Sequence, residues 1–380
     1  MKFFIINTDY QDFIDKKYRQ NPEIKNRSFS EQLEHRYNTF FGVSNFYSKN
    51  LKLIGHEAID IISNDSIMQG RWASENKLGQ LKLLLDLFEL PLIKKIPRIK
   101  RKILELILLK QIEKYSPDVV YNMAMESVDS AFLSKVKNKG KIFIVGQHAA
   151  PITKSMSNLD AYDLIFSSLP NYVENFKKKG LDAEYLKLAF EESILEKTQD
   201  VTDKIYDVIY VGSFSQNHSS RIKTLEHLAE QKEFKIDFWG YDTKELSPTS
   251  PIINNFHGFI GGLDMYKVIK QAKVCINGHI NISEQYANNM RLYETTGMGT
   301  LLITDQKVNI NQIFKVDEEI LTYSSKEDLT EKIVAILKQD DKLKRVSEAG
   351  QKRTLTEHTY RKRMEEMVNL INLHKKNVTS

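Results

Sequence analysis

Polar and charged side chains lie just ahead of an apolar strand pattern in the segment 286–305. Three of them are predicted on one short helix: Asn289, Arg291 and Glu294. Gly297 and Gly299 are expected to end that helix, and a buried strand follows over residues 300–304. In doubly wound sheets, ligands bind where strand ends meet helix starts. The pattern therefore predicts a ligand site, and the structural alternative is an Arg291–Glu294 ion pair on an exposed helix face.

A second segment is typical of anion binding. The strand pattern 208–211 opens into Gly212 and Ser213, and His218 and Arg221 follow at the start of an expected helix. Glycine lets backbone approach a phosphate, and a helix N-terminus supplies N–H groups and partial positive charge. We predict that Gly212, Ser213 and Arg221 bind phosphate. The alternative is that the glycine only makes a turn.

Two further strand ends present polar side chains to the same edge. Tyr241 follows the strand pattern 236–239, and Asn277 follows the pattern 274–276. Tyr241 could stack on a base, or it could equally be an ordinary turn or core residue. Asn277 and His279 could bind a ligand by hydrogen bonds, and a structural role for His279 is equally open.

Strand patterns alternate with helical patterns in two series, which indicates βαβ units, mainly parallel sheets and an α/β fold class. The first series covers residues 3–6, 58–63, 119–123, 142–145, 164–167 and 185–188. The second covers 208–211, 236–239, 274–276, 301–304 and 320–323. A polar stretch without strand signals separates them, so we predict a domain boundary near residues 190–203. A last, amphipathic helix is expected over 359–373.

Composition narrows the class of protein. With 380 residues, 41% hydrophobic and 28% charged, the chain is long enough for two globular domains. The net charge of +5 does not suggest nucleic acid as a partner. Its one cysteine excludes an intramolecular disulfide and fits a reducing cytosol. The apolar run of the first residues is far too short for a signal-peptide core, and it meets Asn7 and Asp9 at once. No window is apolar enough to span a membrane, so we expect a cytoplasmic protein.

The motif Asn-x-Arg-x-x-Glu at 289–294, followed by Gly-x-Gly at 297–299, resembles the donor-nucleotide segment of GT-B glycosyltransferases, in particular the CgeB-like spore-maturation group. The resemblance continues through residues 309–314 and 349–360. It implies two Rossmann-like domains. The expected N-terminal, acceptor-side domain covers residues 1–195 plus a crossing helix at 360–380, and the nucleotide-sugar-binding domain covers 203–359.

The resemblance also implies a reaction. We expect metal-independent transfer of a sugar, without a cofactor, from a nucleotide diphosphate sugar to a hydroxyl of a glycan or lipid-linked acceptor, as in polysaccharide biosynthesis. Glu294 matches the acid that usually binds the nucleotide ribose in retaining enzymes of this fold. The position of their other acid, eight residues earlier, holds Tyr286, which leaves open whether the mechanism is retaining.

Two segments of the first domain complete the implied site. His148 follows the strand pattern 142–145 after Gly146 and Gln147. It resembles the histidine that, in this fold, touches the donor sugar or acts as base. The alternative is a structural histidine. Gly42 and Ser44 resemble the glycine loop that lines the acceptor side, and the insertion 9–37 ahead of them is expected to help shape an acceptor pocket.

The segment 93–109 interleaves six cations with apolar residues at helical spacing, Ile99, Ile103 and Leu106 among them. Such a helix can lie on an anionic bilayer, which predicts peripheral contact with the inner membrane surface. The alternative is a core-packed helix with a solvated basic face.

Missing motifs exclude other classes. The absence of Gly-x-Gly-x-x-Gly after a strand disfavours a dehydrogenase, and the absence of Gly-x4-Gly-Lys-Ser/Thr disfavours a phosphate-loop NTPase. The absence of Asp-x-Asp disfavours a metal-dependent glycosyltransferase. Two alternatives stay open: a nucleotide-sugar epimerase or hydrolase on the same fold, and a non-catalytic sugar-nucleotide or glycan-binding subunit.

Overall fold

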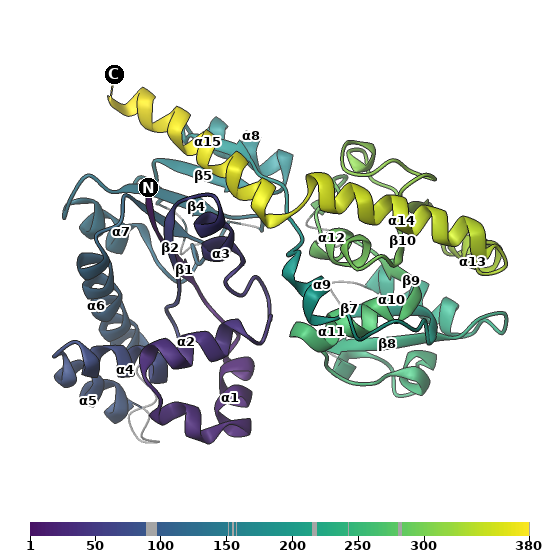
Figure 1. Cartoon of the computed structure of the whole chain (residues 1–380), viewed down its shortest axis with the longest axis horizontal. Helices are drawn as coiled ribbons and strands as arrows, with labels where there is room; N and C mark the ends of the chain where they lie inside the picture. The colour runs from purple at the N-terminus through teal and green to yellow at the C-terminus, as the bar shows by residue number, and fades with distance from the viewer. Residues whose placement is uncertain are drawn as a thin grey trace. The chain divides into compact units, whose positions relative to one another are not determined.

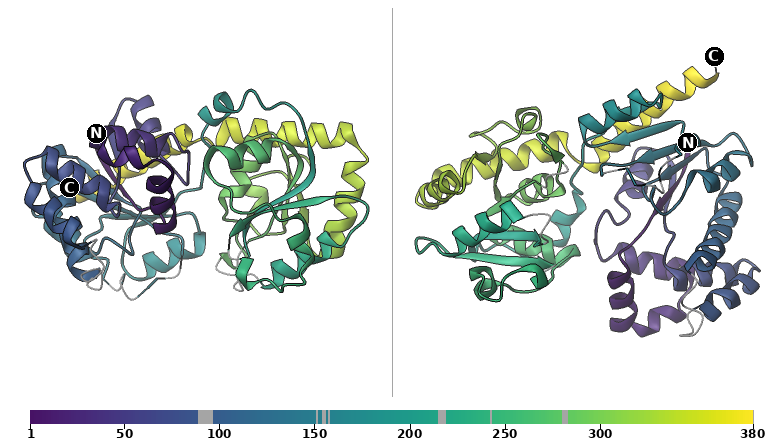
Figure 2. Two further views of the ribbon diagram at one scale, coloured as in Figure 1. Left: turned by 90° about the horizontal axis from the view of Figure 1, so that it is seen from below. Right: turned by 180° about the vertical axis from the view of Figure 1, so that it is seen from behind.

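The computed structural model describes residues 1–88, 97–150, 152–153, 156, 158–214, 219–241, 243–279 and 283–379. The chain divides into two compact units. Unit 1 contains Met1–Leu186 and Met364–Ser380, and unit 2 contains Lys187–Arg363. Each unit carries one parallel sheet between helices (Figures 1 and 2), so the predicted α/β class with two Rossmann-like domains is confirmed.

Unit 1 contains a six-stranded sheet in the order β2-β1-β3-β4-β5-β6, and all its pairs are parallel. Its strands are β1 (Lys2–Asn7), β2 (Glu57–Ile62), β3 (Val119–Asn122), β4 (Phe143–Gln147), β5 (Leu164–Ser167) and β6 (Ala183–Tyr185). Its helices are α1 (Gln11–Gln20), η1 (Pro22–Asn26), α2 (Phe29–Tyr37), α3 (Phe46–Leu53), α4 (Ser66–Glu75), α5 (Gly79–Phe88), α6 (Pro97–Tyr115), α7 (Ser130–Lys137), α8 (Pro170–Lys178) and α15 (Tyr360–Thr379). Strand β1 shows why the sequence pattern is readable: Phe3–Ile6 are all buried, as expected of a parallel strand covered on both faces.

The insertion between β1 and α3 folds as α1, η1 and α2, and buried ion pairs hold it to the unit. The Arg36 guanidinium donates to both carboxylate oxygens of Asp9 at 2.6 Å. The Lys17 ammonium pairs with Asp65 at 2.5 Å, and Asp65 caps α4. Because these charges are buried and paired, removing one partner would leave the other uncompensated.

Unit 2 contains a five-stranded parallel sheet in the order β11-β10-β9-β7-β8. Its strands are β7 (Tyr206–Ser213), β8 (Ile236–Tyr241), β9 (Ala272–Asn277), β10 (Leu301–Asp305) and β11 (Leu321–Tyr323). Its helices are α9 (Ser193–Lys197), α10 (Ser219–Ala229), η4 (Thr243–Glu245), η5 (Pro251–Asn255), α11 (Gly262–Lys270), α12 (Met290–Gly297), η7 (Ile310–Gln312), α13 (Lys326–Leu337) and α14 (Asp340–Glu357).

The units part at Leu186, ahead of the predicted boundary at 190–203. Phe190 explains the difference, because it is buried and pairs with the backbone of residues 358–360: its N–H donates to His358 at 2.8 Å, and its carbonyl accepts from Tyr360 at 2.9 Å. Its ring also packs against Gly297, where a Cβ would lie 2.4 Å from it. These contacts tie the polar linker to unit 2, and they depend on residues more than a hundred positions away.

The last helix, α15, returns to unit 1 from Met364 onward, which confirms the predicted crossing helix. His374 anchors it there, with Nε2 3.2 Å from Glu184 and Nδ1 3.4 Å from Asp182.

The basic segment 93–109 lies partly outside the described residues, which resume at 97 in α6. The sequence pattern suggested that its apolar residues share one exposed face, but they differ in exposure. Ile103 is buried at 5% exposure, whereas Ile99 and Leu106 are 42% and 50% exposed. No helix in the described ranges is long and apolar enough to cross a bilayer.

Candidate functional site

The topology of unit 2 singles out the carboxyl ends of β7 and β9. From β7 the chain first adds β8 on one side and later β9 on the other, so the strand order reverses between β7 and β9. Open parallel sheets bind ligands in the crevice at such a point. Ser213 ends β7 and Asn277 ends β9, so the sequence-predicted residues around them share this edge.

Arg221 bridges the two strand ends. Its Nη2 donates to the Ser213 carbonyl and its Nη1 to the Gly278 carbonyl, both at 2.9 Å. Gly278 leaves room for it, since a Cβ there would lie 3.1 Å from the Arg221 Cδ. A guanidinium carries five N–H groups, so two bonds to carbonyls fix it in place while other N–H groups can still donate to an anion. His218, predicted nearby, lies outside the described residues.

Glycine at 212 is required by packing. A Cβ at Gly212 would lie 2.4 Å from the Tyr210 hydroxyl, and a Cβ at Gly240 on the paired strand would lie 1.7 Å from the Gly212 carbonyl oxygen. The Tyr210 side chain therefore explains Gly212, and close packing of β7 and β8 explains Gly240, without a ligand. A role of Gly212 in phosphate binding stays a prediction.

Tyr241 lies opposite Ser213 in the β7–β8 register, at the end of β8. Its side chain is 52% exposed. It is thus not a core residue, and its ring is accessible at the candidate edge.

A hydrogen-bond chain connects the first turn of α12 to β9 and β10. The Asn289 side chain accepts from the Arg291 backbone N–H at 2.8 Å and donates to the Asn277 Oδ1 at 2.9 Å. The Asn277 Nδ2 then donates to Thr304 at 3.0 Å. Asn289 is therefore the N-cap of α12, not a residue within the helix as predicted, because its side chain replaces a missing helical acceptor.

Arg291 and Glu294 form a buried ion pair. The Arg291 Nη1 lies 2.9 Å from Glu294, with side-chain exposures of 12% and 9%. The alternative of an exposed surface pair is therefore wrong. Arg291 also donates to the Val211 carbonyl at 3.3 Å, and Tyr266 donates to Glu294 at 3.3 Å. The arrangement holds a carboxylate and a guanidinium beside the end of β7.

Two pKa values reflect this burial. Burial works to lower the pKa of Arg291, but the Glu294 carboxylate together with Cys275, Tyr266 and Tyr210 outweighs burial and raises that pKa. Burial and then the Glu294 charge raise the pKa of Tyr266 well above its usual value. Arg291 therefore stays cationic and Tyr266 stays a neutral donor to Glu294.

The structure pairs His279, a predicted ligand contact, with Asp305, for which no role was predicted. The His279 Nδ1 lies 2.6 Å from Asp305, and the His279 backbone N–H donates to the same oxygen at 3.0 Å. Burial works to raise the pKa of Asp305, but hydrogen bonds and charge from His279 and the nearby Lys307 hold it below its usual value. Asp305 ends β10 and therefore lies at the candidate edge. An acid at the end of an apolar strand pattern was the feature of the sequence that could have predicted it.

In unit 1, His148 directly follows β4 and is 9% exposed. Its backbone N–H donates to the Phe166 carbonyl at 3.0 Å. The neighbouring Gln147 accepts from Tyr47 of α3 at 2.8 Å, so the loop leading into α3 ends at the same edge of this sheet as His148.

That loop contains the predicted Gly42 and Ser44, both with positive φ, of 56° and 42°. Ser44 is 1% exposed and donates to the Tyr37 carbonyl at 2.7 Å. Its hydroxyl thus stabilises the turn, and any acceptor contact by Gly42 or Ser44 stays a prediction.

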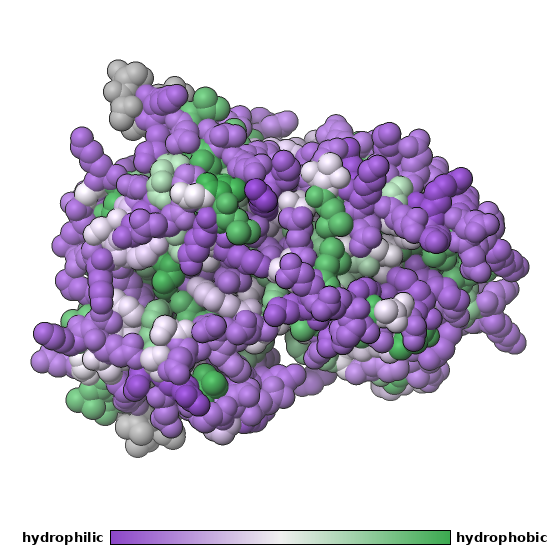
Figure 3. All heavy atoms as spheres, in the orientation of Figure 1, coloured by the Kyte–Doolittle hydropathy of each residue, from purple (hydrophilic) through white to green (hydrophobic). Residues whose placement is uncertain are grey.

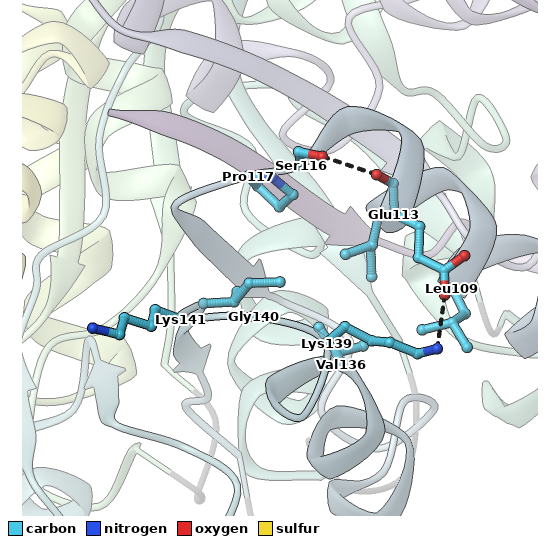
Figure 4. Close-up of a pocket in the computed structure, with 10 residues that line it drawn as sticks. Leu109, Glu113, Ser116, Pro117, Val136, Lys139, Gly140 and Lys141 are labelled. Atoms are coloured by element: carbon cyan, nitrogen blue, oxygen red, sulfur yellow. Dashed lines mark hydrogen bonds and ion pairs between the residues drawn. The ribbon is translucent and has the colours of Figure 1, made fainter.

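A separate cavity of about 310 Å³ lies at the amino-terminal edge of the unit 1 sheet (Figure 4). Lys139 and Glu113 pair across it at 3.2 Å, beside Pro117 and Ile142, which precede β3 and β4. Parallel sheets bind ligands at their carboxyl ends, so this cavity does not belong to the candidate site.

The fold of the whole chain and the sequence of residues 221–369 are similar to known proteins. Sucrose-phosphate synthase from Thermosynechococcus elongatus aligns over 100% of both chains with a TM-score of 0.60 at 10% identity. Anabaena HepE in complex with UDP-glucose aligns over 98% of this chain and 99% of its own, with a TM-score of 0.59 at 9% identity. A UDP-N-acetylglucosamine 2-epimerase described as putative, from Listeria monocytogenes, aligns over 99% and 97% with a TM-score of 0.50 at 11% identity.

These likenesses define the GT-B fold. Residues 221–369 match the family described as Glycosyl transferase-like, a range that contains Arg221, Asn289, Arg291 and Glu294. A search of curated proteins found no sequence match. The chain therefore has the predicted GT-B fold, and its residues 221–369 are similar in sequence to glycosyltransferases.

Proposed function

We propose that unit 2 binds a nucleotide diphosphate sugar and that the protein transfers the sugar to a hydroxyl of a glycan or lipid-linked acceptor. The observation that carries the donor assignment is the guanidinium of Arg221, held between the ends of β7 and β9 where the strand order reverses. Anabaena HepE, which shares the fold, was crystallised with UDP-glucose and with UDP, and this supports a uridine nucleotide as the first donor to test.

The other residues have roles that follow from their chemistry. The Glu294 carboxylate can accept hydrogen bonds from ribose hydroxyls, and Arg291 adds positive charge near the diphosphate. Asn289 and Asn277 hold α12 against β9, so they position Arg291 and Glu294. The exposed ring of Tyr241 is available to stack on the base.

In the transfer step, the bond between the anomeric carbon and the diphosphate oxygen breaks, and the acceptor oxygen bonds to that carbon as its hydroxyl proton leaves. Cationic side chains and backbone N–H groups stabilise the departing diphosphate without a metal or a cofactor. We assign the sugar-facing or proton-accepting role to His148 and the acceptor side to the loop of Gly42 and Ser44.

The test is incubation of the purified protein with a panel of nucleotide sugars, scoring hydrolysis and transfer with and without chelator. Transfer or slow hydrolysis of one donor supports the proposal. Absence of nucleoside diphosphate binding by calorimetry would reject it.

A nucleotide-sugar epimerase is the second candidate, favoured by the Listeria structure of that description on the same fold. A product with altered sugar stereochemistry and an intact nucleotide would support it. Binding of a nucleotide sugar without turnover would instead indicate a non-catalytic binding subunit, an alternative favoured by Tyr286 at the position of the missing acid.

We further propose that the protein belongs to the CgeB-like group, on the motif at 289–299, and that it works in the cytoplasm. Peripheral contact with the inner membrane surface through the segment 93–109 is part of the same proposal, and the exposed Ile99 and Leu106 of α6 support it.

A further inference from the structure

Helix α5 is apolar on two opposite sides. Its inner side packs on the unit 1 core through Leu81, Leu85 and Phe88. Its outer side exposes Leu83, Leu84 and Leu87 at 63%, 42% and 41%. We call these three residues the leucine face. Surface helices normally show one apolar side only, so a second one indicates a further apolar partner.

The charged residues of α5 add no net charge beside the leucine face. Lys82 and Asp86 form an i,i+4 ion pair with each other. The helix therefore presents three leucines beside a charge-neutral pair.

Cations follow immediately along the chain. Residues 93–102 read Ile-Lys-Lys-Ile-Pro-Arg-Ile-Lys-Arg-Lys, with six cations and no acid. In the described part of this run, Arg98 and Lys102 are exposed at the start of α6, and Ile99 is 42% exposed beside them. Arg101 differs, because it pairs with Glu105 at 3.1 Å and Asp129 at 3.0 Å.

Helices α5 and α6 pack against each other in unit 1. Figure 3 shows hydrophobic atoms gathered at the lower left of the visible face, where Figure 1 places α5. Exposed leucines on α5 and exposed cations on the helix packed against it match the two layers of an anionic bilayer surface, in which acyl chains lie beneath negative headgroups.

We propose that the leucine face and the cations at the start of α6 dock unit 1 on an anionic lipid surface. This inference rests on the proposed function and narrows its acceptor to a lipid-linked one held at that surface. It moves the main apolar contact from the predicted segment 93–109 to α5.

The experiment is flotation of the full chain with vesicles of phosphatidylcholine alone or mixed with phosphatidylglycerol. We expect binding to the anionic vesicles only, weakened by salt. Replacing Leu83, Leu84 and Leu87 by serine should lower partitioning at least about tenfold, since three apolar side chains stay in water. Arg98→Gln and Lys102→Gln should each lower it about fivefold.

The matched control replaces Leu53 and Leu373, exposed by 61% and 59% elsewhere in unit 1, by serine and should leave binding unchanged. All replaced leucines are exposed, so circular dichroism and thermal unfolding should match the wild type. Equal flotation of the triple variant and the wild type, or no flotation of the wild type, would overturn the proposal. So would a dimer that only the triple variant loses, because a second copy would then cover the face.

A measurement of nucleoside diphosphate binding distinguishes failure of the lipid proposal from failure of the proposed function. The triple variant should bind nucleoside diphosphate as the wild type does, because the leucine face belongs to unit 1 and the donor residues to unit 2. Flotation without nucleotide binding would reject the donor assignment and leave the lipid surface supported.

Discussion

Replacing Arg221 by alanine tests the donor site most directly. The guanidinium makes two hydrogen bonds, to the Ser213 and Gly278 carbonyls, and its remaining N–H groups are assigned to the diphosphate. Losing a charge-assisted phosphate contact should cost about 1.5–3 kcal/mol, which is roughly 10- to 150-fold in affinity. The two strand-end carbonyls are only part-buried and water can replace the donor, so we expect the stability of unit 2 to fall by about 1–3 kcal/mol.

The assay is calorimetry of UDP and of uridine with folded variant protein. Arg221→Ala should weaken UDP and leave uridine nearly unchanged, because only the diphosphate meets the guanidinium. Lys223→Ala is the matched control, since Lys223 is an exposed cation on the same helix, α10, and should change neither affinity. Unchanged UDP affinity in a folded Arg221→Ala protein would refute the assignment of Arg221 to the phosphate.

Four further outcomes are expected. Glu294→Gln should weaken uridine more than pyrophosphate in calorimetry, and it should lower the free energy of unfolding by about 3–5 kcal/mol because the Arg291 charge stays buried without its partner; equal weakening of both ligands would make Glu294 structural. His148→Ala should lower kcat by a factor of roughly 100 to 10,000 with little change in nucleotide affinity, and wild-type kinetics would contradict the assigned role. Activity should persist in excess chelator; complete loss that magnesium or manganese restores would reject the metal-independent mechanism. Burial raises the pKa of Asp60 to about 6, above its value in the unfolded chain, so the contribution of Asp60 to stability is fully present below about pH 4 and is lost as pH rises through about 6. Asp60→Asn should therefore be about 3 kcal/mol more stable than wild type in urea unfolding at pH 7 and equal to it near pH 4, and the same stability difference at both pH values would contradict the buried ionisation.

Much of the fold could be predicted because its strands are short continuous apolar runs. Residues 3–6, 208–211 and 301–304 were expected as strands, and all lie within β1, β7 and β10. A parallel strand is covered on both faces, so its own residue types indicate it without knowledge of its neighbours. The same local logic placed Arg291 and Glu294 on one helix at the ligand edge.

Features that depend on distant residues could not be predicted. The burial of the Arg291–Glu294 pair depends on Tyr266 and on the end of β7, and the domain boundary depends on Phe190 pairing next to Thr359. The partner of His279 is Asp305, 26 positions later. No local spacing encodes such contacts.

The sequence by itself therefore determined two parallel α/β units, an amphipathic last helix and a charged segment at a sheet edge, because periodicity and glycine positions act over a few residues. Tertiary structure decided which of those charges are buried, which side chains only position others, and which helix exposes leucines to solvent. Burial is a property of what packs around a residue, and the packing partners come from elements far apart in the chain.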